Sequence, residues 1–298
     1  MRVERACEKF LKYCRFERGL SKHTLAAYEQ DLNEFTRAFP NWHIGLITGE
    51  QLVTFAQTLS SPRSLSPATI KRRLACLRAM FRQLVRQKAI ETNPFAEVDL
   101  RIRIPARLPR NLTLGEVRAL LTAARSNPTT RVAVLLLIAT GIRIGELATI
   151  KLQDVDFDQR SIRIVGKGNR ERRVFLSDIA LVDALRNYIA VAHGSIVSPQ
   201  HNLLINLRGE PASAACLRNQ IVALGGRAEL TRHITPHMFR HTAATNLVEA
   251  GVDIRFIQRL LGHKSISTTQ IYTYVSDGAL RNAIVAANVY RVIEPLER

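Results

Sequence analysis

The chain has 298 residues and 46% hydrophobic content, enough for two domains that each bury a core. Its formal net charge of +18 is spread over both halves and indicates a polyanionic partner, of which DNA and RNA are the commonest. The charge alone does not establish nucleic-acid binding, since a solubilising surface or ribosome association would also account for it.

The first hundred residues are predicted to be helical. Residues 21–39 place apolar side chains three and four apart behind Ser21, a typical N-cap. Residues 66–88 repeat this pattern with Ser66 and Pro67 at the start and no acidic side chain. Like charges four apart repel, so we expect phosphates to lie opposite this basic helix. The expected DNA contacts are Lys71, Arg72, Arg73, Arg78 and Arg82.

A linker is predicted after these helices. Residues 93–112 contain three prolines and four arginines, which is typical of an extended, stiffened segment. We therefore place the domain boundary near Pro105, between a helical DNA-binding domain at 1–105 and a second domain at 106–298.

The second domain is predicted to be mainly helical with a small β-hairpin. One helix is expected to begin at Thr113, and a buried one to end at Gly141. Segments 161–165 and 172–176 flank the turn sequence GKGN and have the two-residue period of strands. The pattern after residue 178 or so is helical again, so the fold class is mainly α with a small sheet.

Two segments of this domain place arginines where an anion could bind. Arg143 follows the end of a buried helix in TGIRIGEL, although by itself it is equally typical of a surface residue. Thr235 and Pro236 are expected to begin a helix that carries His237 and Arg240 on one face of its first turns. The unpaired N–H groups and positive dipole of that helix end favour a phosphate.

The sequence indicates neither a metal site nor a cofactor. His237 and His241 have the spacing of a zinc-binding HExxH helix, but Met238 replaces the glutamate and no third ligand is evident. The cysteines form no CxxC pair and are expected to be reduced core residues, as in cytosolic proteins. They are Cys7, Cys14, Cys76 and Cys216.

The compartment is expected to be the cytoplasm. The N-terminus is charged and has no apolar signal core. The longest apolar run, residues 132–139, is too short to span a bilayer. We therefore expect no membrane partner.

The stretch STTQIYTYV raises the question of which tyrosine is reactive. Ser267 and Gln270 form a capping box that is expected to open the last helix, after LLGH has ended the previous one at its glycine. Because a helix turns about 100° per residue, Tyr272 and Tyr274 point in nearly opposite directions. Only one of them can face a reactive site.

Taken in chain order, these motifs resemble those of the tyrosine recombinases, specifically the Xer-like branch. The resemblance covers essentially the whole chain, including GLSKHTLAAYEQDLNEF and SPATIKRRLACLRAMFR, which look like that family's SAM-like core-binding domain. Each motif alone is weak, but the full set in the right order is specific. The residues that match the family's catalytic set are Arg143, Lys167, His237, Arg240, His263 and Tyr272.

The resemblance implies transesterification of a DNA phosphodiester without a metal. Tyr272 would be the nucleophile that forms a 3′-phosphotyrosyl ester, and Tyr274 a packing residue. The two arginines and His263 would bind the phosphate. Lys167 would protonate the 5′ leaving group, and His237 would accept the phenolic proton.

The same resemblance implies how the protein assembles. The two domains would clamp double-stranded DNA. A tetramer would act on it, made either of four identical copies or of copies paired with a second recombinase. A host activator would be a further partner. Arg170 and Arg172 in the hairpin would contact DNA, although Glu171 between them departs from a purely basic segment. The tail at 276–298 has apolar residues on much of its helical surface and is expected to dock on a neighbouring subunit; the alternative is that it folds back onto its own domain.

Several biological tasks fit this set. Resolution of chromosome or plasmid dimers fits best, and a recombinase of a transposon or integrative element is a close second, because nothing in the catalytic set separates the two. A non-catalytic DNA-binding protein fits less well because the active set is complete. A type IB topoisomerase shares the chemistry but not the helical N-terminal domain.

Overall fold

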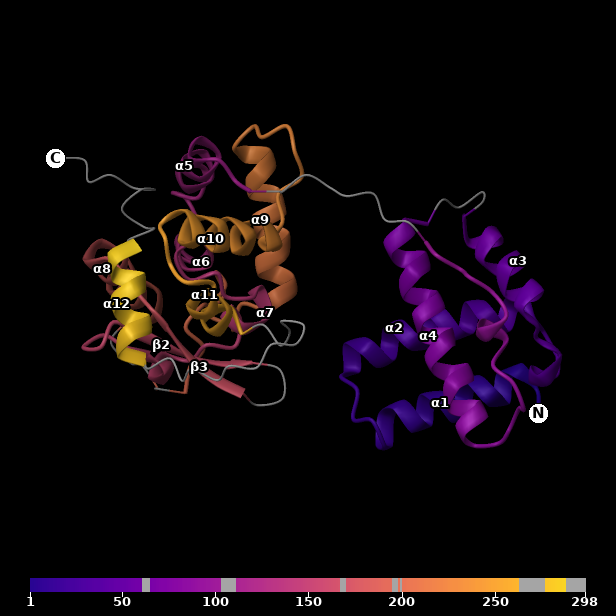
Figure 1. Ribbon diagram of the computed structural model, residues 1–298. Helices are drawn as coiled ribbons and strands as arrows, with labels where there is room; N and C mark the ends of the chain where they lie inside the picture. The colour runs from indigo at the N-terminus through magenta and orange to yellow at the C-terminus, as the bar shows by residue number, and fades with distance from the viewer. Residues whose placement is uncertain are drawn as a thin grey trace. The chain divides into compact units, whose positions relative to one another are not determined.

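The computed structural model of the chain describes residues 1–60, 65–102, 111–166, 170–194, 198, 200–262 and 277–287 (Figure 1). The chain divides into two compact units, Met1–Ala106 and Arg107–Arg298. Among the described residues, no helix is both long and apolar enough to cross a membrane.

The first unit is built from helices around an aromatic core. Its elements are α1 (Val3–Phe16), α2 (Lys22–Ala38), η1 (Ile44–Leu46), α3 (Gly49–Ser60), α4 (Pro67–Arg86) and η2 (Pro94–Ala96). The predicted caps are confirmed: Ser21 accepts from the backbone N–H of Thr24, and Ser66 from that of Thr69. Phe35 lies at the centre, fully buried and in contact with the rings of Phe39, Phe55 and Phe81.

The second unit combines helices with a small antiparallel sheet. Its first helices are α5 (Leu114–Ala123), α6 (Pro128–Thr140) and α7 (Ile144–Leu147), followed by η3 (Leu152–Asp154). The sheet has the order β1 (Val155–Asp156), β2 (Ser161–Gly166), β3 (Arg170–Phe175). The later helices are α8 (Ile179–His193), α9 (Ala214–Arg227), α10 (Pro236–Glu249), α11 (Ile254–Leu261) and α12 (Asp277–Ala287).

Helix α6 is the central element of this unit. It is buried at every position from Val132 to Thr140 and packs against α8, α9 and α10 (Figure 1). The predicted hairpin is confirmed as β2 and β3, whereas β1 was not predicted because two residues have no recognisable period.

The turn that ends α6 depends on glycine. Gly141 has φ +63°, and a Cβ built there would lie 2.6 Å from Leu261 Cδ2 and 3.3 Å from Ala243 Cβ. We expect Gly141→Ala to lower the free energy of unfolding of the second unit by about 3 kcal/mol, because left-handed backbone strain adds to a clash in the core. Denaturant titration followed by circular dichroism measures this loss.

Two controls separate these contributions. Gly251 has φ +78° with nothing within 4 Å of a built Cβ, so Gly251→Ala should cost only about 1 kcal/mol of backbone strain. Trp42, the one tryptophan of the chain, lies in the first unit, so its fluorescence transition should stay unchanged in both variants. Equal losses in the two variants would show that the contact with Leu261 is unimportant.

Helix α12 differs from the expectation for the C-terminal tail. Ile284 is 3% exposed and belongs to the core of its own unit, where α12 packs against β3 and α11 (Figure 1). The apolar stripe of residues 280–287 was expected to dock on a neighbouring subunit, with folding onto its own domain as the alternative. In the described structure, at least Ile284 and Ala287 are instead covered by their own domain.

Candidate active site

Helix α10 carries two of the expected catalytic residues. Thr235 is at its N-cap and Pro236 at the first helical position, as predicted, although the Thr235 side chain does not cap the helix. His237 follows and is exposed, close to the N–H groups of the first turn. Arg240, almost one turn further along, points into the protein and is 8% exposed.

Arg240 joins three separate elements. Its Nη1 donates to Gly141 O, after α6, and its Nη2 donates to Leu261 O at the end of α11, both at 2.7 Å. Burial, with a smaller contribution from the charge of Arg143, lowers the pKa of Arg240 to about 10. The guanidinium therefore remains charged at neutral pH, in a position where its solvation is poor.

Arg143 lies at the start of α7, directly after the Gly141 turn. Its Nη1 and Nη2 donate to Leu261 O and Gly262 O at 3.4 Å. Its side chain is 42% exposed, unlike that of Arg240. The two expected phosphate-binding arginines are thus brought to the same end of α11, one buried and one open to solvent.

The buried carboxylate of Glu146 offsets part of the positive charge of this cluster. It accepts from Arg143 Nη1 at 3.0 Å and from the Arg143 backbone N–H at 2.9 Å. Arg172, on β3, donates to both carboxylate oxygens at 3.0 and 2.7 Å and to Leu260 O at 2.7 Å. Burial alone raises the pKa of Glu146, but the bonds from Arg172 and Arg143 outweigh it and hold that pKa below its usual value.

This arrangement favours an anion. Three guanidinium groups from α7, β3 and α10 converge on the last turn of α11, and Glu146 is the carboxylate hydrogen-bonded to two of them. A helix C-terminus attracts cations through its unpaired carbonyls, which explains why the arginines gather there. The remaining positive charge suits a phosphate held by paired arginine donors.

The rest of the expected catalytic set lies outside the described residues. Lys167 comes directly after β2, and His263 directly after the Gly262 cap of α11. Tyr272 lies in the segment before α12. Among the residues that the structure describes, no group of three or more His, Cys, Asp or Glu side chains could hold a metal ion.

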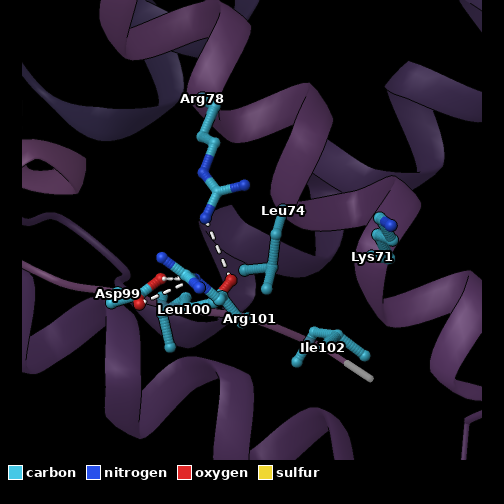
Figure 2. A pocket seen from close by; sticks show the side chains of 7 residues that line it. All are labelled: Lys71, Leu74, Arg78, Asp99, Leu100, Arg101 and Ile102. Carbon is cyan, nitrogen blue, oxygen red and sulfur yellow. Dashed lines mark hydrogen bonds and ion pairs between the residues drawn. The ribbon is translucent and has the colours of Figure 1, made fainter. Parts of the chain in front are cut away.

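The expected DNA contacts of α4 divide into two groups. Lys71, Arg78 and Arg82 share one face of the helix, and Lys71 and Arg82 are exposed. Beside Lys71 and Arg78 lies a pocket of about 440 Å³, closed on its other side by residues 99–102 (Figure 2). Arg78 also holds this segment, since it donates to Leu100 O at 3.0 Å and lies over the Phe95 ring.

Arg72 and Arg73 are both engaged by the first unit itself, although the Arg72 side chain remains 40% exposed. Both pair with Asp31 of α2, which is 1% exposed. The Arg73 side chain is itself 8% exposed and reaches Glu34 as well. A buried carboxylate requires a cation, so these two arginines join α2 to α4.

We expect this difference to be measurable in single variants. Lys71→Met should weaken DNA binding and lower the magnitude of the salt-dependence slope by about 1, with stability unchanged. Arg73→Met should instead lower the free energy of unfolding of the first unit by about 2 kcal/mol, because Asp31 loses one of two partners. Salt-series binding titrations and Trp42 fluorescence separate the two effects. A reduced salt slope for Arg73→Met at full stability would contradict this assignment.

In the hairpin, Arg170 is exposed and Arg172 is not. The Arg172 side chain is 12% exposed and is engaged by Glu146, so it does not face DNA as expected. Sequence reasoning also missed Glu146, although its position three residues after Arg143 at the start of a helix could have indicated a pair.

Comparison with known proteins establishes the class. Residues 110–278 match the phage integrase family, and residues 7–88 match the phage integrase N-terminal SAM-like domain. The chain belongs to the phage integrase family, the tyrosine recombinases, and it is a site-specific DNA recombinase. The resemblance noted in the sequence is thereby confirmed, as is the mainly helical fold.

The relatives place it near the Xer proteins. It is 38% identical to tyrosine recombinase XerC of Listeria innocua over 92% of this chain and 94% of the relative. It is 31% identical to tyrosine recombinase XerD of Halalkalibacterium halodurans over 94% of this chain and 96% of the relative. The fold is shared with the Tn1549 transposon integrase in complex with transposon right-end DNA, with a TM-score of 0.76 and 21% identity over 95% and 98% of the two chains.

Proposed function

We propose that this recombinase cleaves and rejoins DNA strands through a 3′-phosphotyrosyl intermediate on Tyr272. The observation that carries the proposal is the convergence of Arg143 and Arg240 on Leu261 O, close in sequence to His263. Such paired donors suit the two non-bridging oxygens of one phosphate, whose charge grows in the transition state.

The chemistry then balances without a metal or cofactor. The Tyr272 oxygen forms a bond to phosphorus, the phosphorus–O5′ bond breaks, and the phenolic proton passes to His237. Lys167 gives its proton to the departing 5′ oxygen, and His263 donates to the phosphate. In the reverse step, a 5′-hydroxyl from another strand attacks phosphorus and releases the tyrosine.

The substrate is double-stranded DNA, in our proposal, and the task is Xer-like dimer resolution in the cytoplasm. The similarity to XerC and XerD relatives over most of the chain supports this task, and the basic face of α4 supports DNA binding by the first unit. Lambda integrase has been solved as a tetramer bound to a Holliday junction, with the same fold. We propose a tetramer for this chain too, either of identical copies or with a second recombinase, with a host activator as an additional partner. Transposition genes beside its own gene would favour the mobile-element role instead.

Covalent trapping tests the proposed function. A binding site is selected from random-sequence duplexes, and copies nicked at successive positions serve as substrates, because the short fragment beyond the nick diffuses away after cleavage. We expect a protein–DNA adduct that survives denaturing electrophoresis. Binding to the selected site without any adduct would favour the non-catalytic alternative.

The C-terminal tail should couple neighbouring subunits through residues beyond α12. A chain ending at Ala287 keeps the buried Ile284 in place, whereas one ending at Asn282 would remove part of the core. We expect the chain ending at Ala287 to bind one site normally and to lose about tenfold in cooperativity on paired sites. Gel-shift titration of one-site and two-site DNA measures this, and unchanged cooperativity would mean that the last residues do not link subunits.

A further inference from the structure

Arg172 has the geometry of a structural cation placed inside the active site. It bonds Glu146 through Nη1 and Nη2 and Leu260 O through Nε, so each of its three nitrogens donates a hydrogen bond to the protein. It is 12% exposed, compared with 42% for Arg143. Both Nη groups of Arg172 are paired with a carboxylate, whereas those of Arg240 bond only backbone carbonyls, so the charge of Arg172 is the one already offset by the protein.

The neighbours of Arg172 are the groups that position the phosphate-binding arginines. Glu146 also bonds Arg143, and the carbonyls of residues 260, 261 and 262 each accept from one or two of the three arginines. Gly262 lies so close that a Cβ built there would be 3.5 Å from Arg172 Nη1. Arg172 therefore connects β3 both to α7 and to the end of α11.

Electrostatics gives this contact a consequence. A buried carboxylate paired with Arg143 alone would hold that guanidinium strongly and cancel its charge. Arg172 offers two hydrogen bonds to the carboxylate, at 3.0 and 2.7 Å, against one from the Arg143 side chain at 3.0 Å. The charge of Glu146 is thus shared, and Arg143 keeps charge to offer a phosphate.

We propose that Arg172 is a positioning residue for strand cleavage, which neutralises Glu146 and braces the end of α11 so that Arg143 is free to bind the scissile phosphate. This inference rests on the proposed function and goes beyond it, because it gives Arg172 a role through Glu146 and the end of α11, not through DNA. It reassigns a residue that the sequence alone suggests as a DNA contact.

The test measures cleavage and binding separately on the nicked substrate described above. Arg172→Met should slow adduct formation at saturating protein about 100-fold, since a small misplacement of a phosphate-binding group has this effect. The dissociation constant for the site should change less than about threefold. Arg172→Lys keeps the positive charge but loses the paired N–H donors of the guanidinium, and should slow adduct formation about tenfold.

A second substitution distinguishes positioning from general damage. Glu146→Gln in the Arg172→Met background removes the carboxylate that would otherwise hold Arg143, so the double variant should cleave about tenfold faster than Arg172→Met alone. Arg173→Met is the matched control: Arg173 is adjacent on β3, exposed, and bonds Gln159 on the opposite face. It should cleave at nearly the normal rate.

Three results would overturn the inference. The first is that Arg172→Met weakens DNA binding without slowing cleavage. The second is that the double variant cleaves no faster than Arg172→Met. The third is that Arg173→Met slows cleavage as much as Arg172→Met does. Rates are compared per folded molecule, and the folded fraction is measured by circular dichroism. If Arg172→Met does not fold, Arg172→Lys is used for the test instead. The proposed function is tested separately, by whether the unaltered chain forms the adduct.

Discussion

Tyr272→Phe should abolish covalent protein–DNA adducts, by about 10⁴-fold or more, and leave DNA affinity unchanged. The substitution removes one oxygen, which is the atom that would form the bond to phosphorus, and keeps the aromatic ring. Tyr274→Phe should retain adduct formation, because residues two apart in the helix expected from the sequence differ by about 200° in direction. Both tyrosines lie outside the described residues, so the experiment decides between them independently of the structure.

The measurement is adduct formation on the nicked substrate together with a gel-shift titration on the intact site. Equal affinities for the three proteins show that the variants are folded and bind DNA. An adduct formed by Tyr272→Phe would reject this nucleophile, and its loss in Tyr274→Phe alone would assign the role to Tyr274. Peptide mapping of the adduct would then identify the attached residue directly.

Lys167→Ala should lose cleavage of ordinary DNA by about 10² to 10⁴-fold, the usual contribution of a general acid. The 5′ oxygen is a poor leaving group unless it is protonated. A thiolate departs without a proton, since a thiol has a pKa of about 8.5. Cleavage by Lys167→Ala should therefore recover on a substrate with sulfur at the 5′-bridging position.

Arg240→Ala is the comparison that makes this result specific. Arg240 is expected to stabilise charge on the non-bridging oxygens, which builds up whichever atom departs, so sulfur should restore little of its activity. Equal rescue of the two variants would remove the support for Lys167 as the acid. Because Arg240 also bonds Gly141 O and Leu261 O, the folded fraction of this variant has to be measured alongside.

Much of the fold was predictable because its boundaries are set by local chemistry. Ser66 and Pro67 begin α4, and Gly141 ends α6 with the left-handed backbone that glycine allows. The hairpin followed from a two-residue period on each side of a glycine-containing turn. β1 is too short to have a pattern, and the burial of Ile284 depends on the surface that α12 meets.

The candidate catalytic residues came from family motifs that are short and contiguous, and the charge of the chain indicated a polyanionic partner. Of these residues, the structure describes Arg143, His237 and Arg240. Only the tertiary structure decided what each charge pairs with. Arg240 bonds a carbonyl 99 residues away, Arg72 a carboxylate 41 residues away, and Arg172 a carboxylate 26 residues away. A basic side chain looks the same in a sequence whether it faces solvent or a buried carboxylate. Its role depends on its burial and on the partner that folding supplies. Arg73 and Arg172 are each paired with a buried carboxylate, whereas Lys71 is exposed.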